Sequence, residues 1–264
     1  MDQSSSSLPR LFTVFSLLSL TIKIQAMDSQ VSPTPFIVEQ YTNDKKTHVL
    51  LAAATIKLPD IAEALCRNKN ISVRILVTET AENLIAGQSL EQPVLGTLLH
   101  IDGVDAIYRD EDEWTPSWTR GGPVLHIELR KWAHILLVAP MSANTMAKMT
   151  NGIADNLLLS VIRAWDTTGV VDMGFKTQKP MIIAALDMDP CTYRHPVTEK
   201  QLKVLRDQWE RSESNPKGWV TVLPPIEKNL ACGDVGTGSA GSMMDWRDIV
   251  TVVQNYVAGS AQKS

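Results

Sequence analysis

The chain has 264 residues, of which 44% are hydrophobic and 20% charged, so it can bury one sizeable core and is expected to form one domain. Its formal net charge is −4 and its pI is about 5.8. No run of lysines and arginines supplies the positive surface that phosphate backbones require, which argues against nucleic acid as a partner.

The three cysteines, Cys66, Cys191 and Cys232, are widely spaced and match no paired CxxC or Cys/His pattern. This arrangement predicts a reducing, cytoplasmic location, with neither a disulfide framework nor a zinc site.

Residues 1–45 are expected to precede the domain, which we place at residues 46–258, with a short tail at 259–264. Residues 11–22 form an apolar run that has the length of a signal-peptide core and is too short to span a membrane. One interpretation is a targeting segment. The other is an upstream-extended start or a disordered leader, because Asp2 precedes the run and a second start-like Met27 follows it. We treat Met27 onward as the functional chain and expect no membrane partner.

The first predicted strand is the apolar run from His48 to Ala54, followed by a helix from Lys57 to Arg67. Residues 72–78 predict the second strand. Thr78, Glu79 and Thr80 then open another helix, and this turn can face a phosphate group. Residues 87–103 show no regular pattern.

An acidic run, Arg-Asp-Glu-Asp-Glu-Trp, occupies residues 109–114. Its carboxylates have no spacing that converges on a cation, so we expect a solvated loop and no metal site. Residues 124–131 then predict a short helix that carries His126. A lone histidine on such a helix is more often a packed or surface residue than a catalyst.

The chain is organised around the apolar strand Ile135 to Ala139, which Pro140 is expected to end. The next residues, Ser142, Ala143, Asn144 and Thr145, can cap and open a helix whose first N–H groups point beyond the strand end. A strand that leads into a helix N-terminus forms an anion site. In open α/β sheets, nucleotide-like cofactors bind in that crevice.

Residues 155–165 predict a helix whose apolar positions exceed one narrow face, so we expect it to be buried on more than one side. A strand at 181–185, a helix at 196–210, a strand at 218–223 and a closing helix at 245–257 complete the chain. Strands that alternate with helices in this way predict an α/β domain with a parallel, doubly wound sheet.

Taken together, three motifs resemble the flavin-containing cysteine decarboxylase family: Val-Leu-His-Ile-Glu-Leu at 124–129, Ser-Ala-Asn-Thr at 142–145 and Ala-Cys-Gly-Asp at 231–234. The nearest branch contains phosphopantothenoylcysteine decarboxylases and the halotolerance proteins of plants and fungi. The resemblance covers residues 46–257. It implies a flavodoxin-like, Rossmann-type three-layer sandwich that binds FMN. It also implies a homotrimer, or a mixed trimer with a paralogue, in which the active site lies between subunits.

The same resemblance implies roles for individual residues. His126 falls on the family's active-site histidine, and Cys232 on a flap cysteine suited to deliver a proton. The implied substrate-binding residues are Asp189, Asn229 and Ala231, and the implied cofactor-binding residues are Thr78, Glu79, Thr80, Ser142, Ala143, Asn144, Thr145 and Asp187. The implied reaction is the FMN-dependent decarboxylation of 4′-phosphopantothenoylcysteine to 4′-phosphopantetheine, a step of coenzyme A biosynthesis. A related decarboxylase acting on a peptide cysteine is a further alternative.

Three positions depart from the family pattern. The turn at residues 51–57 is short and lacks the glycine that lets backbone approach the flavin phosphate. Asp189 replaces an asparagine that can donate to a substrate carboxylate, and Asn229 replaces a common arginine. Asp187, Asp189 and Asn229 favour the alternative of a catalytically impaired, halotolerance-type inhibitory subunit of a Ser/Thr protein phosphatase. Retention of His126 and Cys232 favours the enzyme.

Overall fold

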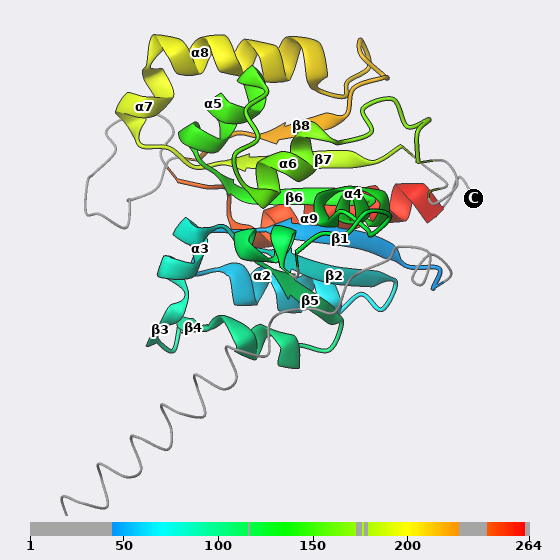
Figure 1. Cartoon of the computed structure of the whole chain (residues 1–264). Helices are drawn as coiled ribbons and strands as arrows, with labels where there is room; N and C mark the ends of the chain where they lie inside the picture. Colours follow the sequence, from blue (N-terminus) through cyan, green and yellow to red (C-terminus); the bar gives the residue numbers. More distant parts are fainter. Residues whose placement is uncertain (1–43, 116, 173–175, 177–178, 227–241, 262–264) are drawn as a thin grey trace, which may run out of the picture.

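The computed structural model describes residues 44–115, 117–172, 176, 179–226 and 242–261. Six parallel strands form its central sheet, in the order β5-β2-β1-β6-β7-β8 (Figure 1). Their bounds are β1 Thr47–Ala52, β2 Ile71–Leu76, β5 Val104–Tyr108, β6 Ile135–Met141, β7 Met181–Leu186 and β8 Val220–Leu223. The sheet grows outward in both directions from the β1–β6 pair, in which Val49 lies opposite Ile135 and Ala52 opposite Val138. The prediction of a parallel, doubly wound sheet is therefore confirmed.

Strand side chains alternate between two cores. Val49 and Leu51 of β1 point into the core on one face, and Leu50 and Ala52 point into the core on the other. Because both faces are covered, the strands are almost continuously apolar, as parallel strands usually are.

Helices cover each face of this sheet. The first face carries α2 (Leu58–Cys66) and α9 (Trp246–Ala261), which pack against each other. The opposite face carries α4 (Leu125–Trp132), α5 (Ala143–Asn151), α6 (Leu157–Arg163) and α8 (Pro196–Lys203) (Figure 1). The expectation that the helix near residues 155–165 is buried on several sides is confirmed, because Leu157, Leu158, Leu159, Val161 and Ile162 are all buried.

Shorter elements connect these layers. They are α3 Glu79–Leu84, β3 Ala86–Ser89, β4 Gln92–Val94, the 3₁₀ segments η2 Leu95–His100 and η3 Asp110–Trp114, α7 Pro190–Arg194 and the π-helical segment η4 Val204–Trp209. Strands β3 and β4 form a separate antiparallel pair.

Two expectations about local structure are wrong. Pro140 does not end the strand, since β6 continues to Met141; the register with β7 shifts between Val138 and Met141, and this irregularity accommodates a residue without an N–H group. The acidic run is not a solvated loop. It forms η3, in which Asp112 is buried and accepts a hydrogen bond from the Arg109 backbone N–H at 2.7 Å.

Among the residues described, no helix is long and apolar enough to cross a membrane. The apolar run at residues 11–22 lies outside them.

Candidate functional site

A crevice of about 570 Å³ opens at the carboxyl ends of β1, β2, β6 and β7. It lies over the β1–β6 pair, where the sheet order reverses, and this is the usual ligand position in open α/β sheets. The crevice is lined by Ala52, Ala53, Ala54, Leu76, Thr78, Glu79, Thr80, Ala81, Leu84, Asp110, Val138, Pro140, Ser142, Asn144, Thr145, Lys148, Asp155, Asn156, Leu158 and Asp187. Seven of the eight residues expected to bind a cofactor are in this list, the exception being Ala143.

Helix α5 begins at the crevice wall. The Ser142 hydroxyl accepts a hydrogen bond from the Thr145 backbone N–H at 3.1 Å and so caps the helix, as the sequence predicted. Ala143 faces a neighbouring groove of about 480 Å³, which Asn144 also lines. The first turn of α5 thus lies between two hollows and offers polar groups and a helix N-terminus to an anionic ligand.

Asp110 joins two other helix starts at the same crevice. One carboxylate oxygen accepts from the Leu157 N–H at the start of α6 at 2.9 Å. The other oxygen accepts from the Glu79 N–H at the start of α3 at 3.3 Å. This carboxylate was not predicted as a site residue, because the acidic run that contains it, at residues 109–114, was expected to be a solvated loop.

Asp187 lies at the end of β7 and is half-buried in the crevice wall. Burial raises the pKa of its carboxyl group, and a hydrogen bond from the Met243 N–H, at 3.1 Å, opposes that rise. The preceding residue, Ser242, forms an antiparallel bridge with Ile226. Asp187 therefore links the bridge between Ile226 and Ser242 to the wall of the crevice.

Asp189 is not among the residues that line the crevice. Its side chain is exposed and caps α7, where one oxygen accepts from the Cys191 and Thr192 backbone N–H groups at 2.9 and 3.1 Å. The Thr192 hydroxyl donates to the other oxygen, and this bond holds the pKa of the Asp189 carboxyl below its usual value. The charge of Asp189 is thus directed toward its own helix.

His126 lies in the first turn of α4 and does not line the crevice. Its Nδ1 atom is 2.7 Å from Oε1 of Glu113, a residue of η3. The predicted residues Asn229, Ala231 and Cys232 fall at positions 227–241, outside the described residues.

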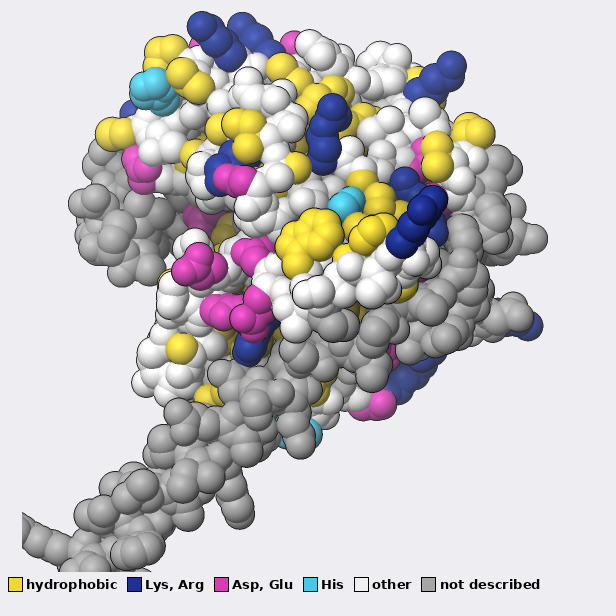
Figure 2. All heavy atoms as spheres, viewed as in Figure 1, with side chains coloured by type: hydrophobic (Ala, Val, Ile, Leu, Met, Phe, Trp, Pro, Cys, Tyr) yellow, Lys and Arg dark blue, Asp and Glu magenta, His cyan; other side chains and the backbone are white. Residues whose placement is uncertain are grey.

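The charged residues that line the crevice are mostly acidic. Glu79, Asp110, Asp155 and Asp187 contribute carboxylates, and within the described part of the wall Lys148 contributes the one basic side chain, 2.6 Å from Asp155. Figure 2 shows acidic side chains gathered over α3 and its surroundings, while lysines and arginines are scattered. A phosphate group at this site therefore depends on hydroxyl and backbone donors more than on cationic side chains.

The residues present fit a flavin mononucleotide in size and donor chemistry. The volume lies within the range of about 300–1,000 Å³ that small-molecule sites occupy. The small side chains of Ala52, Ala53 and Ala54 leave room beside β1 despite the absence of a glycine there, and the α5 start supplies hydroxyl groups.

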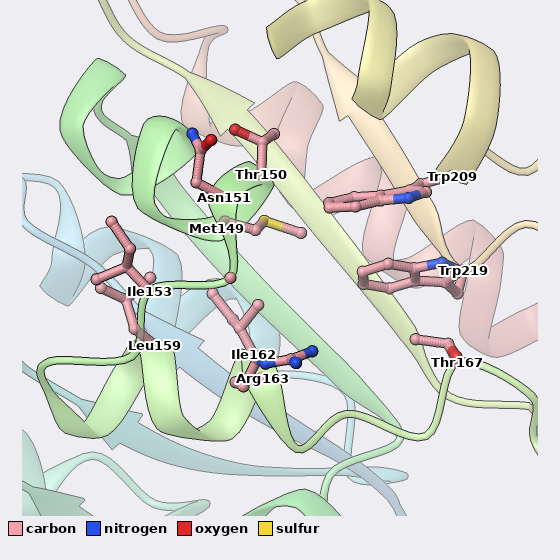
Figure 3. A pocket seen from close by; sticks show the side chains of 11 residues that line it. Met149, Thr150, Asn151, Ile153, Leu159, Ile162, Arg163, Thr167, Trp209 and Trp219 are labelled. Atoms are coloured by element: carbon pink, nitrogen blue, oxygen red, sulfur yellow. The ribbon is translucent and has the colours of Figure 1, made fainter.

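A second hollow of about 310 Å³ lies away from the crevice (Figure 3). Trp209 and Trp219, whose ring centroids are 4.9 Å apart, form one side, and residues of α5 and α6, among them Met149 and Ile162, form the other. Of the predicted site residues that the structure describes, none lines this hollow.

Comparisons with known proteins agree with this geometry. The model of the family described as Flavoprotein matches residues 37–258. A phosphopantothenoylcysteine decarboxylase of Arabidopsis thaliana is 38% identical over 207 residues, which cover 76% of this chain and 82% of that protein. A Schizosaccharomyces pombe protein named probable thymidylate synthase is 38% identical over 216 residues; the match covers 80% of this chain but only 29% of that longer protein.

Solved structures give the same result. A phosphopantothenoylcysteine decarboxylase mutant in complex with pantothenoylaminoethenethiol superposes with a TM-score of 0.61 at 34% identity, over 80% of this chain and 98% of the other. The FMN-binding protein AtHal3 gives a TM-score of 0.59 at 32% identity, over 81% and 98% of the two chains.

Proposed function

Because the chain belongs to the Flavoprotein family, we propose that it binds FMN in the crevice over β1 and β6 and decarboxylates 4′-phosphopantothenoylcysteine to 4′-phosphopantetheine. The observation that carries this proposal is the convergence of the predicted residues Thr78, Ser142, Asn144, Thr145 and Asp187 on one crevice at the strand ends. Two of the similar proteins are named as a decarboxylase of this substrate and as an FMN-binding protein.

In this proposal, Ser142, Asn144 and Thr145 hold polar groups of the cofactor, and the alanines at 52–54 leave space for it. When bound there, FMN would supply two-electron chemistry: oxidation of the substrate thiol, which creates the electron sink that loss of CO₂ requires, and return of the same two electrons to the product. His126 then holds the substrate or moves a proton, because an imidazole can do either near neutral pH. Cys232 is proposed to supply the proton that replaces CO₂.

His126 lies outside the crevice of its own chain, which favours an active site completed by another subunit. We therefore propose a homotrimer, or a mixed trimer with a paralogue, in the cytoplasm. Light scattering of the purified chain tests the trimer, and fractionation of the source cells tests the location.

The first experiment is an absorbance spectrum of the full chain, followed by assay of CO₂ release from phosphopantothenoylcysteine with and without added FMN. We expect a yellow protein that releases CO₂. The variant H126N should stay yellow and lose turnover, since His126 does not line the crevice. A wild-type protein that binds FMN but releases no CO₂, alone or mixed with a paralogue, refutes the decarboxylase.

The alternative is a halotolerance-type inhibitory subunit of a Ser/Thr protein phosphatase. The acidic crevice wall favours it, because carboxylates repel an anionic substrate. Titration of the chain into a phosphatase assay tests it: dose-dependent inhibition by a protein without decarboxylase activity supports the regulator.

A further inference from the structure

Glu113 and His126 form a pair between two elements. Glu113 lies in η3 and His126 in α4, and the Oε1 and Nδ1 atoms are 2.7 Å apart. The carboxylate is almost fully buried, with 7% of the side chain exposed, whereas the imidazole is 24% exposed. We propose that Glu113 is the positioning residue of His126: it fixes the Nδ1–H tautomer and leaves Nε2 free to exchange a proton with substrate. This inference rests on the proposed function.

The tautomer follows from the chemistry of the two groups. An ionised carboxylate only accepts hydrogen bonds, so the ring nitrogen that faces it must carry the proton. In a neutral imidazole the other nitrogen, Nε2, then has the lone pair. No hydrogen bond of Nε2 is found among the described residues. Nε2 is therefore the ring nitrogen of His126 that can exchange a proton with substrate.

The surroundings of Glu113 point to more than a stabilising ion pair. Its second oxygen, Oε2, is buried and has no hydrogen-bond partner in the described structure. A carboxylate removed from water on one side loses free energy that one contact does not fully restore. Buried polar atoms usually have a hydrogen-bond partner, and exceptions to this rule are often found at functional sites.

The backbone around Glu113 is held firmly. Asp112 caps η3 through the Arg109 N–H, and Asp110 binds the starts of α3 and α6. Asp110 lines the crevice, and Glu113, which is three residues after Asp110, contacts His126. A single 3₁₀ segment thus connects the proposed cofactor site to the histidine.

Helix α4 also provides a matched control. Glu128 pairs with Lys131 at 2.9 Å, with 7% of the Glu128 side chain and 25% of the Lys131 side chain exposed. Burial and distance are nearly those of the Glu113 pair, but the partner in this pair is an ammonium group. If Glu113 only stabilises the fold, E113A and E128A should behave alike.

The test is ¹⁵N NMR of the full chain with labelled histidine rings, in the wild type, E113A, E113Q and E128A. We expect Nδ1–H for His126 in the wild type and E128A, and a mixture of both tautomers in E113A. E113Q keeps an oxygen that can accept from Nδ1–H, so it should retain the wild-type tautomer. It also provides a folded variant for comparison if E113A does not fold. A wild-type His126 that is protonated on Nε2, or a tautomer unchanged in folded E113A, overturns the proposal.

CO₂ release supplies the second readout. In E113A, kcat should fall about 10- to 100-fold with KM within about twofold, because acid–base groups contribute about 10²–10⁴ and the imidazole itself remains. E113Q keeps an acceptor for Nδ1–H, so its kcat should lie between those of E113A and the wild type, and E128A should keep the wild-type kcat. Equal kcat in E113A, E113Q and the wild type contradicts the positioning role. A wild type without turnover refutes the proposed function instead, while the NMR result still decides the tautomer.

Discussion

Asp110 gives the sharpest prediction about stability, because one carboxylate binds the starts of two helices that are far apart in sequence. Its two hydrogen bonds, to the N–H groups of Leu157 at 2.9 Å and Glu79 at 3.3 Å, are lost together in D110A. Hydrogen bonds to charged groups contribute about 1.5–3 kcal/mol each, and the second bond is long and exposed. We therefore expect D110A to lower the free energy of unfolding by about 2–4 kcal/mol.

In a domain of this size, that loss lowers Tm by about 5–15 °C. Thermal and urea unfolding, followed by circular dichroism of the FMN-free chain, measures it. D110N keeps one carbonyl oxygen and should lie between D110A and the wild type. The matched control is E111A, since Glu111 is in the same segment, its side chain is 69% exposed, and its ion pair with Arg109 is long at 3.6 Å. E111A should change the free energy of unfolding by less than about 0.5 kcal/mol. A D110A protein as stable as E111A would refute the reasoning.

Three further predictions concern single residues. S142A removes the cap of α5 and should weaken FMN binding about 2- to 10-fold by fluorescence titration; S212A, which removes a similar turn bond away from the crevice, should leave it unchanged. Burial raises the pKa of Asp187, so its contribution to stability is present below the unfolded value of 3.8 and is lost as pH rises through the folded pKa. D187N keeps the acceptor for Met243 and should therefore be more stable than the wild type at pH 7 but not at pH 3, as urea midpoints can show. Burial lowers the pKa of Lys176 from 10.5 to about 8, so the unfolded chain binds more protons between these values. Stability should thus rise with pH across that window, by up to about 3 kcal/mol relative to K176M, and parallel curves for the two proteins would contradict this assignment.

Much of the fold could be predicted because buried parallel strands are marked by uninterrupted apolar runs. The strands around Val49, Leu137 and Ile183 were all found in this way, and each is buried on both faces. Strand β5 was missed because its apolar run is short and is interrupted by the exposed Asp105, and because it lies between irregular segments. The prediction that the strand ends at Pro140 was wrong because the register with β7 shifts there, so the strand continues without the hydrogen bond that proline cannot donate.

The candidate site was predicted where residues adjacent in sequence form it. Ser142, Asn144 and Thr145 follow one strand, and helix capping is a local rule. Asp110 acts through partners 31 and 47 residues away, and such contacts leave no periodic signal. The Glu113–His126 contact was hidden for a related reason, because an acidic run reads as solvated until its tertiary partners are known. The domain limits at residues 46–258 and the catalytic and binding roles of all the predicted site residues stay predictions.

The packing of α9 affects how the protein is made. Ile249, Val253 and Val257 of this helix join the same core as Val49 and Leu51 of β1, the first described strand. On the ribosome, β1, α2 and β2 emerge early, and α2 covers part of one face of these strands, yet the part of the core that α9 completes stays uncovered until residues 246–257 have been synthesised. Nascent chains that expose such surfaces are prone to aggregate. A transcript truncated before α9 should therefore yield an insoluble product that chaperones and proteases remove, even though every strand of the sheet has been translated.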